Sequence, residues 1–464
     1  MRRDVGAPTA RALAHHALHA AHALHAPPAH DPNTNATIGI AYDAFDPDVI
    51  CEEFNRMKSM AAEANGDDEE PKEDPKKKPD ALARGKHYTV FSFQTWSGKQ
   101  KSIHFVVARY ALEKHSSRWL RKANRSVISF LGSFHMYVIG NAYDGASENR
   151  LWMKRTLTIT LRTLISDLLQ PLDRSEIQPH DYYDHMLNPT ARKFNENDLP
   201  LDIAVAYPHP TVIGLLVMGL ADFSHSIKKA TNAVERGNLR GPDLFPVIMK
   251  MLKDVYMETP DMKTDGQIMI YPKLRKEIFE KNAKNRMRVP WAVKCHSESM
   301  ADCIETYRPN LSDRIPIHHW NFTIAHIRRT NRWIDVMNNS RNNGCGPIDR
   351  TDHPHIFELL SYVSHMFQWK KSESVHPDNY FPESTFEDVI LTCTGVLLTA
   401  RIYLPMWRAA GYDDENIVQR RHGTDDLENL FCKSRGANPN ADVKGTHNVI
   451  AGQISGVMNS MAGS

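Results

Sequence analysis

A chain of 464 residues is long enough for two or three domains, or for one domain that carries a large insertion. Apolar residues make up 41% and charged residues 24%, as in an ordinary soluble globular protein, and the net charge of +2 confines any nucleic-acid surface to a local patch. The six cysteines are scattered without a CxxC pair, which argues against a disulfide framework or a zinc module and favours a reducing compartment.

The first part of the chain is biased in composition. Residues 1–35 begin with an Ala- and His-rich run, which predicts a disordered tail, with a metal-binding tract as the alternative. A disordered charged linker is predicted over 62–84, because its run NGDDEEPKEDPKKKPD carries no apolar residue to bury. No apolar run approaches the roughly 20 residues that span a bilayer, so no membrane partner is expected.

Strand patterns dominate residues 36–150. The predicted elements are strands at 36–45, 87–96 and 102–112, a helix at 117–134 and a strand at 135–144. From residue 151 to residue 415 helical periodicity dominates, including the runs RTLTITLRTLISDLLQ and TVIGLLVMGLADFSHSIKKATNAVERG. These patterns predict an α/β sheet core interrupted by a large, mainly α-helical insertion, with the core resuming at 416–445 and a flexible tail at 446–464.

Three acids lie where a sheet could bring them together. Asp43 follows the apolar run IGIAY and Asp144 follows YVIGNAY, so each closes a predicted strand. In the segment DDLENLF the apolar residues define one helix face, and Glu428 lies at the border of that face. A carboxylate at the end of a buried strand is costly unless it is paired or binds a cation.

Three convergent carboxylates would suit Mg²⁺ or Mn²⁺, and paired ions could clamp the attacking and leaving oxygens of a phosphoryl displacement. Each signal also has a simpler interpretation. An Asp at a strand end is often a turn or helix cap, and acids in the first turn of a helix are favoured by the helix dipole.

Five segments, in order, resemble the P-element family of DNA transposases and their THAP-domain relatives. They are IGIAYDAF, NAYDGASENRLW, ADFSHSIKKATNAV, NRMRVPWAVKCHSESMADCIETY and TDDLENLFCKSRG, and they extend from about residue 36 to residue 440. The resemblance implies an RNase H-like catalytic core, with Asp43, Asp144 and Glu428 as metal-binding catalytic acids. Asp425 matches a family Asp that could contribute to a nucleotide site.

The third segment resembles the family's Asp-x-x-His-x-x-Lys-x-x-x-Asn motif at the start of the insertion. Asp222, His225, Lys228 and Asn232 match it and fall close to one helical stripe. The alternative is that this stripe only docks the insertion through salt bridges and hydrogen bonds. GTP is a further candidate ligand, although no Walker GxxxxGK[ST] motif is present.

The resemblance implies a protein that acts on DNA, both transposon ends and target, and that could form a homo-oligomer. A nuclear location is also expected, because the run PKKKP at 75–79 could serve as a nuclear localisation patch, with a solvated charge run as the alternative. The family's zinc-bearing THAP domain and its coiled coil have no counterpart before residue 36, and the block after the last Glu is degraded to SRGANPNADVKGTHN. We therefore expect either an active transposase or a domesticated, catalytically silent relative that binds DNA, nucleotide or protein.

Overall fold

A computed structural model describes a large part of the chain. The described residues are 87–94, 104–112, 116–133, 136–144, 146–169, 196–236, 239–240, 289–311, 317–338, 346–372, 376–413 and 415–423. Asp43, Asp425 and Glu428 lie outside these ranges, as do the predicted tail, linker and first strand.

Two units are distinguished by how the chain packs on itself. The first comprises residues 1–159, 206–219 and 424–464, and the second comprises 160–205 and 220–423. Each unit therefore combines segments that lie far apart in the sequence.

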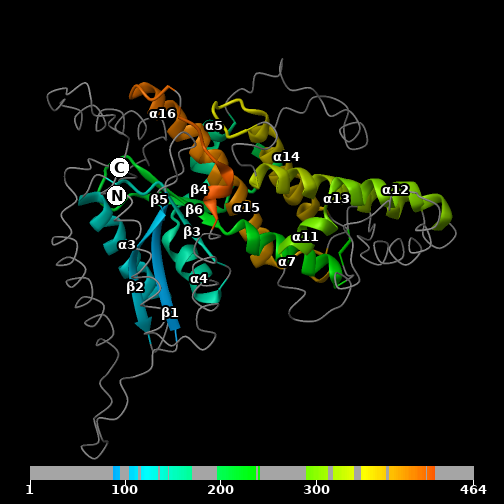
Figure 1. Ribbon diagram of the computed structural model, residues 1–464, viewed down its shortest axis with the longest axis horizontal. Helices are drawn as coiled ribbons and strands as arrows, with labels where there is room; N and C mark the ends of the chain where they lie inside the picture. Colours follow the sequence, from blue (N-terminus) through cyan, green and yellow to red (C-terminus); the bar gives the residue numbers. More distant parts are fainter. Residues whose placement is uncertain are drawn as a thin grey trace, which may run out of the picture. The chain divides into compact units, whose positions relative to one another are not determined.

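The first unit contains a long hairpin that the sequence predicts well. Strands β1 (His87–Gln94) and β2 (His104–Leu112) pair antiparallel, with His87 opposite Leu112 and Gln94 opposite His104. The register shifts once, between Phe91 and Ser92. Figure 1 shows the pair as two long adjacent arrows. The predicted strands at 87–96 and 102–112 are therefore confirmed, with slightly shorter ends.

Helix α3 (Ser117–Ser133) follows the hairpin and matches the predicted helix at 117–134. Its apolar residues recur on one side and are buried, among them Trp119, Leu120, Val127 and Ile128. Strand β3 (Gly140–Tyr143) comes next and is shorter than the predicted strand at 135–144. Helix α4 (Ser147–Thr156) follows, with three residues between the end of β3 and its start.

A four-stranded sheet has the order β3-β6-β5-β4, with β4 at Ile159–Thr160, β5 at Ala204–Pro208 and β6 at Leu216–Ala221. Strands β5 and β6 pair antiparallel, with Ala206 opposite Met218. Every residue of β6 is buried, which explains its continuous apolar sequence LVMGLA. The backbone N–H of Met218 donates to the carbonyl of Ile139, 2.9 Å away, just before β3.

These strands correct two sequence predictions. The runs at 155–170 and 211–237 were expected to be helical, but the first contains β4 and the second contains β6. Helix α7 (Phe223–Glu235) occupies only the end of the second run. A short apolar run has no period that distinguishes a buried strand from a buried helix, and β4 is only two residues long.

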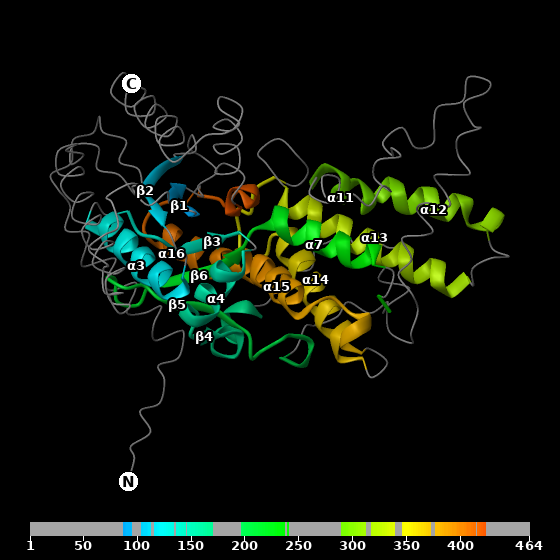
Figure 2. The same cartoon turned by 90° about the horizontal axis from the view of Figure 1, so that it is seen from below.

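The second unit is mainly helical. Its further α-helices are α5 (Ile165–Leu168), α11 (Val289–Cys295), α12 (Glu298–Leu311), α13 (Ile317–Met337), α14 (Pro354–Lys371), α15 (Glu383–Leu398) and α16 (Leu404–Ala409). Figures 1 and 2 show α12 running beside α13, and α14 packs on both α13 and α15. Trp320, Trp333 and Trp369 are fully buried in this unit, and Trp333 stacks on Tyr362 with 4.9 Å between ring centroids.

Helices α15 and α16 form one continuous helical run, Glu383–Ala409, joined by a π-helical turn at Thr399–Tyr403. This run is long and apolar enough, by length and composition, to cross a bilayer, but 83% of its most apolar window is buried inside the protein. The buried core helix of a soluble protein has the same character. Asp388 and Arg401 interrupt its apolar sequence, which is why no uninterrupted span is visible in the sequence.

Candidate functional site

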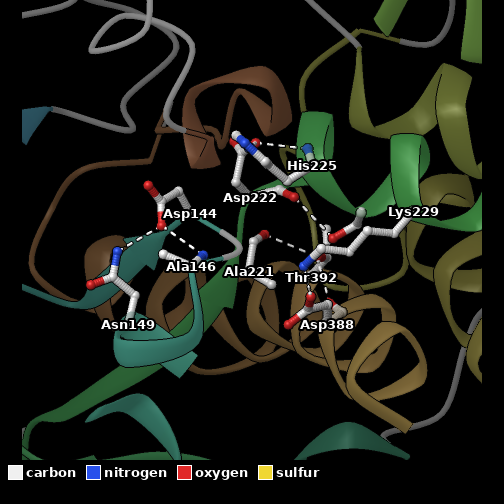
Figure 3. A network of polar contacts seen from close by, with 10 residues as sticks. Asp144, Ala146, Asn149, Ala221, Asp222, His225, Lys229, Asp388 and Thr392 are labelled. Atoms are coloured by element: carbon white, nitrogen blue, oxygen red, sulfur yellow. Dashed lines mark hydrogen bonds and ion pairs between the residues drawn. The ribbon is translucent and has the colours of Figure 1, made fainter. Parts of the chain in front are cut away.

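Asp144 lies immediately after β3, where the sequence places the second of the three predicted acids. Its Oδ1 accepts hydrogen bonds from the backbone N–H of Ala146, 3.0 Å away, and from the side-chain amide of Asn149, 2.6 Å away (Figure 3). Ala146 is the N-cap residue of α4 and supplies no side-chain cap, so Asp144 organises the turn into that helix. Oδ1 of Asp144 therefore stabilises a turn, as the simpler interpretation of a strand-end Asp predicts.

The second oxygen of Asp144 decides whether a cation fits here. The side chain is half-buried, and Oδ2 accepts no hydrogen bond from another residue that the structure describes. A carboxylate oxygen of this kind suits Mg²⁺ or Mn²⁺, which prefer oxygen ligands. Asn149 and Ala146 would hold the carboxylate in a fixed orientation toward such an ion.

Within the described ranges, no group of three or more His, Cys, Asp or Glu side chains is arranged to hold a metal ion. Asp43 and Glu428, the predicted partners of Asp144, lie outside those ranges, and so does Asp425. Convergence of the three acids stays a prediction.

Tyr207 ties β3 to its surroundings within the first unit. Its hydroxyl oxygen accepts from the amide of Asn141 in β3, 2.5 Å away, and from the amide of Asn124 in α3, 3.2 Å away. Burial raises the pKa of Tyr207, so the hydroxyl keeps its proton over the whole working range of pH. These bonds hold β3, the strand that immediately precedes Asp144.

Asp222 is the N-cap residue of α7, in the second unit. Its Oδ2 accepts from the backbone N–H of His225 at 2.9 Å and lies 2.7 Å from Nδ1 of the same residue (Figure 3). The Asp222 side chain is fully buried, whereas the His225 side chain is 23% exposed. The two residues form a local cap that starts the helix.

The two lysines of α7 have different surroundings. Lys228, the residue of the predicted motif, is buried at 6% exposure and forms no hydrogen bond or ion pair with another described residue. The next residue, Lys229, lies 2.5 Å from Oδ2 of the buried Asp388 in α15. On the same helix, Thr392 donates to the carbonyl of Ala221, at the end of β6, over 2.9 Å.

The four residues of the predicted α7 motif therefore do not lie on one common face of the helix. His225 and Asn232 lie half-exposed on one side of α7, Asp222 caps the helix, and Lys228 faces the interior. Sequence reasoning missed Lys229 and Asp388 as the pair that joins α7 to α15. A signal was present, since an acid inside the apolar helix EDVILTCTGVLL needs a partner if it is buried.

No family model matches the chain, and no curated protein matches it. Among solved structures, the fold is similar to that of the Drosophila P element transposase strand transfer complex, with a TM-score of 0.53 and 14% sequence identity. The match covers 76% of this chain and 66% of that one, so the chain spans just under two thirds of the transposase's length. The chain has a P element transposase-like fold.

The transposase-like fold confirms the predicted fold class, an α/β sheet core combined with a large helical part. At 14% identity the likeness concerns the course of the chain and not its side chains. The roles of Asp144 and of the α7 motif therefore depend on the contacts described above.

Proposed function

We propose that this chain is a P-element-like DNA transposase, or a protein derived from one, which cleaves DNA phosphodiesters and transfers strands. Asp43, Asp144 and Glu428 would be its catalytic acids, and would hold Mg²⁺ or Mn²⁺. The observation that carries this proposal is the transposase-like fold together with Asp144 at the end of β3, where one carboxylate oxygen is fixed and the other is available.

The chemistry follows from the ligands. Divalent ions bound by such a trio would stabilise the attacking and leaving oxygens of an in-line displacement at phosphorus. The contribution of the chain is to orient the carboxylates, and Asn149 and the backbone N–H of Ala146 supply this for Asp144.

A catalytically silent relative is the second candidate. It is supported by the structural work that Asp144 already does, because an Asp that starts α4 would be retained in a protein that cuts nothing. Such a relative would bind DNA, nucleotide or a protein partner without any need for metal.

We also propose GTP as a second ligand, with Asp425 on the nucleotide side of its site, and a nuclear location. The nucleotide proposal follows from the resemblance of the insertion motif and the TDDLENLF block to the P-element family. The nuclear location follows from the basic run PKKKP at 75–79, which is typical of a nuclear localisation patch. Binding of GTP should raise the melting temperature of the full chain, because a ligand that binds only the folded state stabilises it. An Asp425→Asn variant should lose this rise.

The test of the main proposal is nicking of supercoiled plasmid by the full chain, with Mg²⁺, with Mn²⁺ and with chelator. Changes in the outer shell of metal sites cost about 10- to 100-fold, so loss of a ligand in Asp144→Asn or Glu428→Gln should reduce nicking at least about 100-fold. The matched control is Asp413→Asn, which alters an exposed acid of the second unit.

Direct binding of Mn²⁺, followed by its electron paramagnetic resonance signal, provides a readout that does not depend on activity. Wild-type chain should take up the ion, and both acid variants should bind it more weakly while keeping the wild-type circular dichroism spectrum. Metal-independent behaviour of the wild type, with no nicking in either ion, would favour the silent relative.

A further inference from the structure

The outward face of α3 carries an uninterrupted set of basic side chains. Its exposed residues in the first three turns include Arg118, Arg121, Lys122 and Arg125, at spacings of three and four residues. Residues at these spacings lie on one side of a helix. The opposite side, with Trp119, is packed in the first unit, so the basic side is fixed toward solvent.

These four side chains, here called the α3 basic face, have no acidic partner among the residues that the structure describes. Helix α3 contains no Asp or Glu, and none of the four forms an ion pair or hydrogen bond with another residue in the described ranges. Other cations of the chain do find partners. Lys229 pairs with Asp388, and Arg162 pairs with Asp202.

Such an arrangement has a cost in the free protein. Like charges three or four residues apart on a helix repel each other and destabilise it. The α3 basic face contains Arg118 with Arg121 and Lys122, and Arg125 with the same two residues. A polyanion that lies along the face would remove this repulsion.

Helix α4 extends the charge at one end. Nη1 of Arg155 donates to Oγ of Ser117, 2.8 Å away, which brings this exposed arginine to the start of α3. The N-terminal turn of α3 also has no acid to offset the positive end of its dipole. The positive charge of both helices thus gathers within the first unit, in a chain whose net charge is only +2.

We propose that the α3 basic face, with Arg155, binds the phosphate backbone of duplex DNA without reading its sequence. The four α3 residues extend over about 10 Å along the helix axis. This length matches about three phosphates of one strand, which advance about 3.4 Å per nucleotide along a duplex. The choice of DNA rests on the proposed function, whereas the anionic and extended nature of the partner rests on the charge pattern.

A membrane surface is a poorer fit. Helices that lie on membranes insert an apolar face between lipids, but the apolar face of α3 is buried in protein. The α3 basic face itself presents only charged residues.

The experiment measures binding of the full chain to a 30-base-pair duplex of arbitrary sequence by fluorescence anisotropy at several salt concentrations. A plot of log affinity against log salt concentration loses about 0.9 of slope for each phosphate contact removed. The triple variant Arg118→Gln, Arg121→Gln and Arg125→Gln should therefore reduce the slope by about 3. Glutamine is a good helix former, so the circular dichroism spectrum and melting temperature should stay at wild-type values or rise.

The matched control removes the same number of charges from exposed basic residues of the second unit, with Arg236, Lys371 and Arg420 replaced by Gln. This control should change the slope by less than about 1. The proposal is overturned if wild-type chain does not bind the duplex, if the triple variant keeps the wild-type salt slope, or if the control variant loses as much slope as the triple variant. Tighter binding to phosphatidylserine vesicles or to single-stranded RNA than to the duplex would also overturn it.

The result of the DNA-binding experiment can be distinguished from the result of the nicking assay. Binding through the α3 basic face without metal-dependent nicking refutes the catalytic proposal and leaves the surface intact. Metal-dependent nicking with an unchanged salt slope in the triple variant supports catalysis and refutes the surface.

Discussion

The hydroxyl group of Tyr207 accepts hydrogen bonds from two side-chain amides next to β3, the strand that precedes Asp144. Both Asn124 and Asn141 donate to it, and the tyrosine is 8% exposed. Tyr207→Phe should lower the free energy of unfolding by about 1–3 kcal/mol, since it leaves two amide groups without their acceptor. Urea denaturation measures this change.

The control for Tyr207 is Tyr412→Phe, because the Tyr412 hydroxyl bonds no other residue that the structure describes. This change should cost less than about 0.5 kcal/mol. Equal losses in the two variants would mean that the two amide bonds contribute nothing specific.

The α7 motif shows how far single residues can be predicted from sequence. An Asp before a helical run predicts an N-cap, and Asp222 is one. The roles of the adjacent lysines could not be predicted, because one step along a helix rotates a side chain by about 100°. Whether Lys228 or Lys229 meets an acid depends on where Asp388 lies, and that acid is 159 residues farther along the chain than Lys229.

At the scale of elements, the ion pair of Lys229 with Asp388 joins α7 to α15. The Asp388 side chain is 2% exposed and that of Lys229 is 24% exposed. Removing one partner of a buried pair leaves an uncompensated charge, at a cost of about 3–5 kcal/mol. Lys229→Met should therefore destabilise the protein by about 2–4 kcal/mol, slightly less than the full range because the lysine is partly exposed.

The neighbouring variant Lys228→Met is the matched control. It removes a buried lysine that pairs with no described residue, so stability should be unchanged or higher. Thermal and urea denaturation of the two variants measure the difference in their stability. If Lys228→Met lowered stability more than Lys229→Met, the ion pair of Lys229 with Asp388 would not be the main contact of these two lysines.

Whether a helix or strand could be predicted from the sequence depended on the length of its periodic pattern. The hairpin β1–β2 and helix α3 were predictable, because each carries a periodic pattern over eight or more residues. Strands β4, β5 and β6 were not, because two to six residues carry no clear period. The pairing of β4 with β5 joins segments more than 40 residues apart, through bonds such as Thr158 N–H to the carbonyl of Ala206.

The same limit applies to the three acids. A local pattern places Asp144 at a strand end, and the structure confirms this placement. No local pattern can bring Asp43 and Glu428 to it, because that depends on how the ends of the chain pair. The metal site therefore stays a prediction that nicking and Mn²⁺ binding must test.

At the scale of the whole molecule, we expect buried histidines to lower the stability of the fold in acid. His296 in the turn between α11 and α12, His326 in α13 and His365 in α14 lie close together, with ring centroids 5.9 and 6.4 Å apart along the series. Burial lowers the pKa of His296 to about 4 and of His326 to about 3, and it lowers that of His365 well below 6.5. The positive charge of Arg329 lowers the pKa of His326 and His365 further.

These shifts predict an acid-labile fold. The unfolded chain takes up protons on these histidines near pH 6.5, whereas the folded chain does so only near pH 3 to 4, so stability falls as the pH drops through this window. Each such histidine contributes about 1.4 kcal/mol per pH unit. His326→Leu should remove about that slope between pH 6 and pH 4.5, with little loss at pH 7.5, because neither ring nitrogen of His326 has a hydrogen-bond partner in the described structure. Urea unfolding at several pH values measures the slope, and the exposed His376→Asn is the control. An unchanged acid slope in His326→Leu would show that this histidine is already protonated in the folded protein.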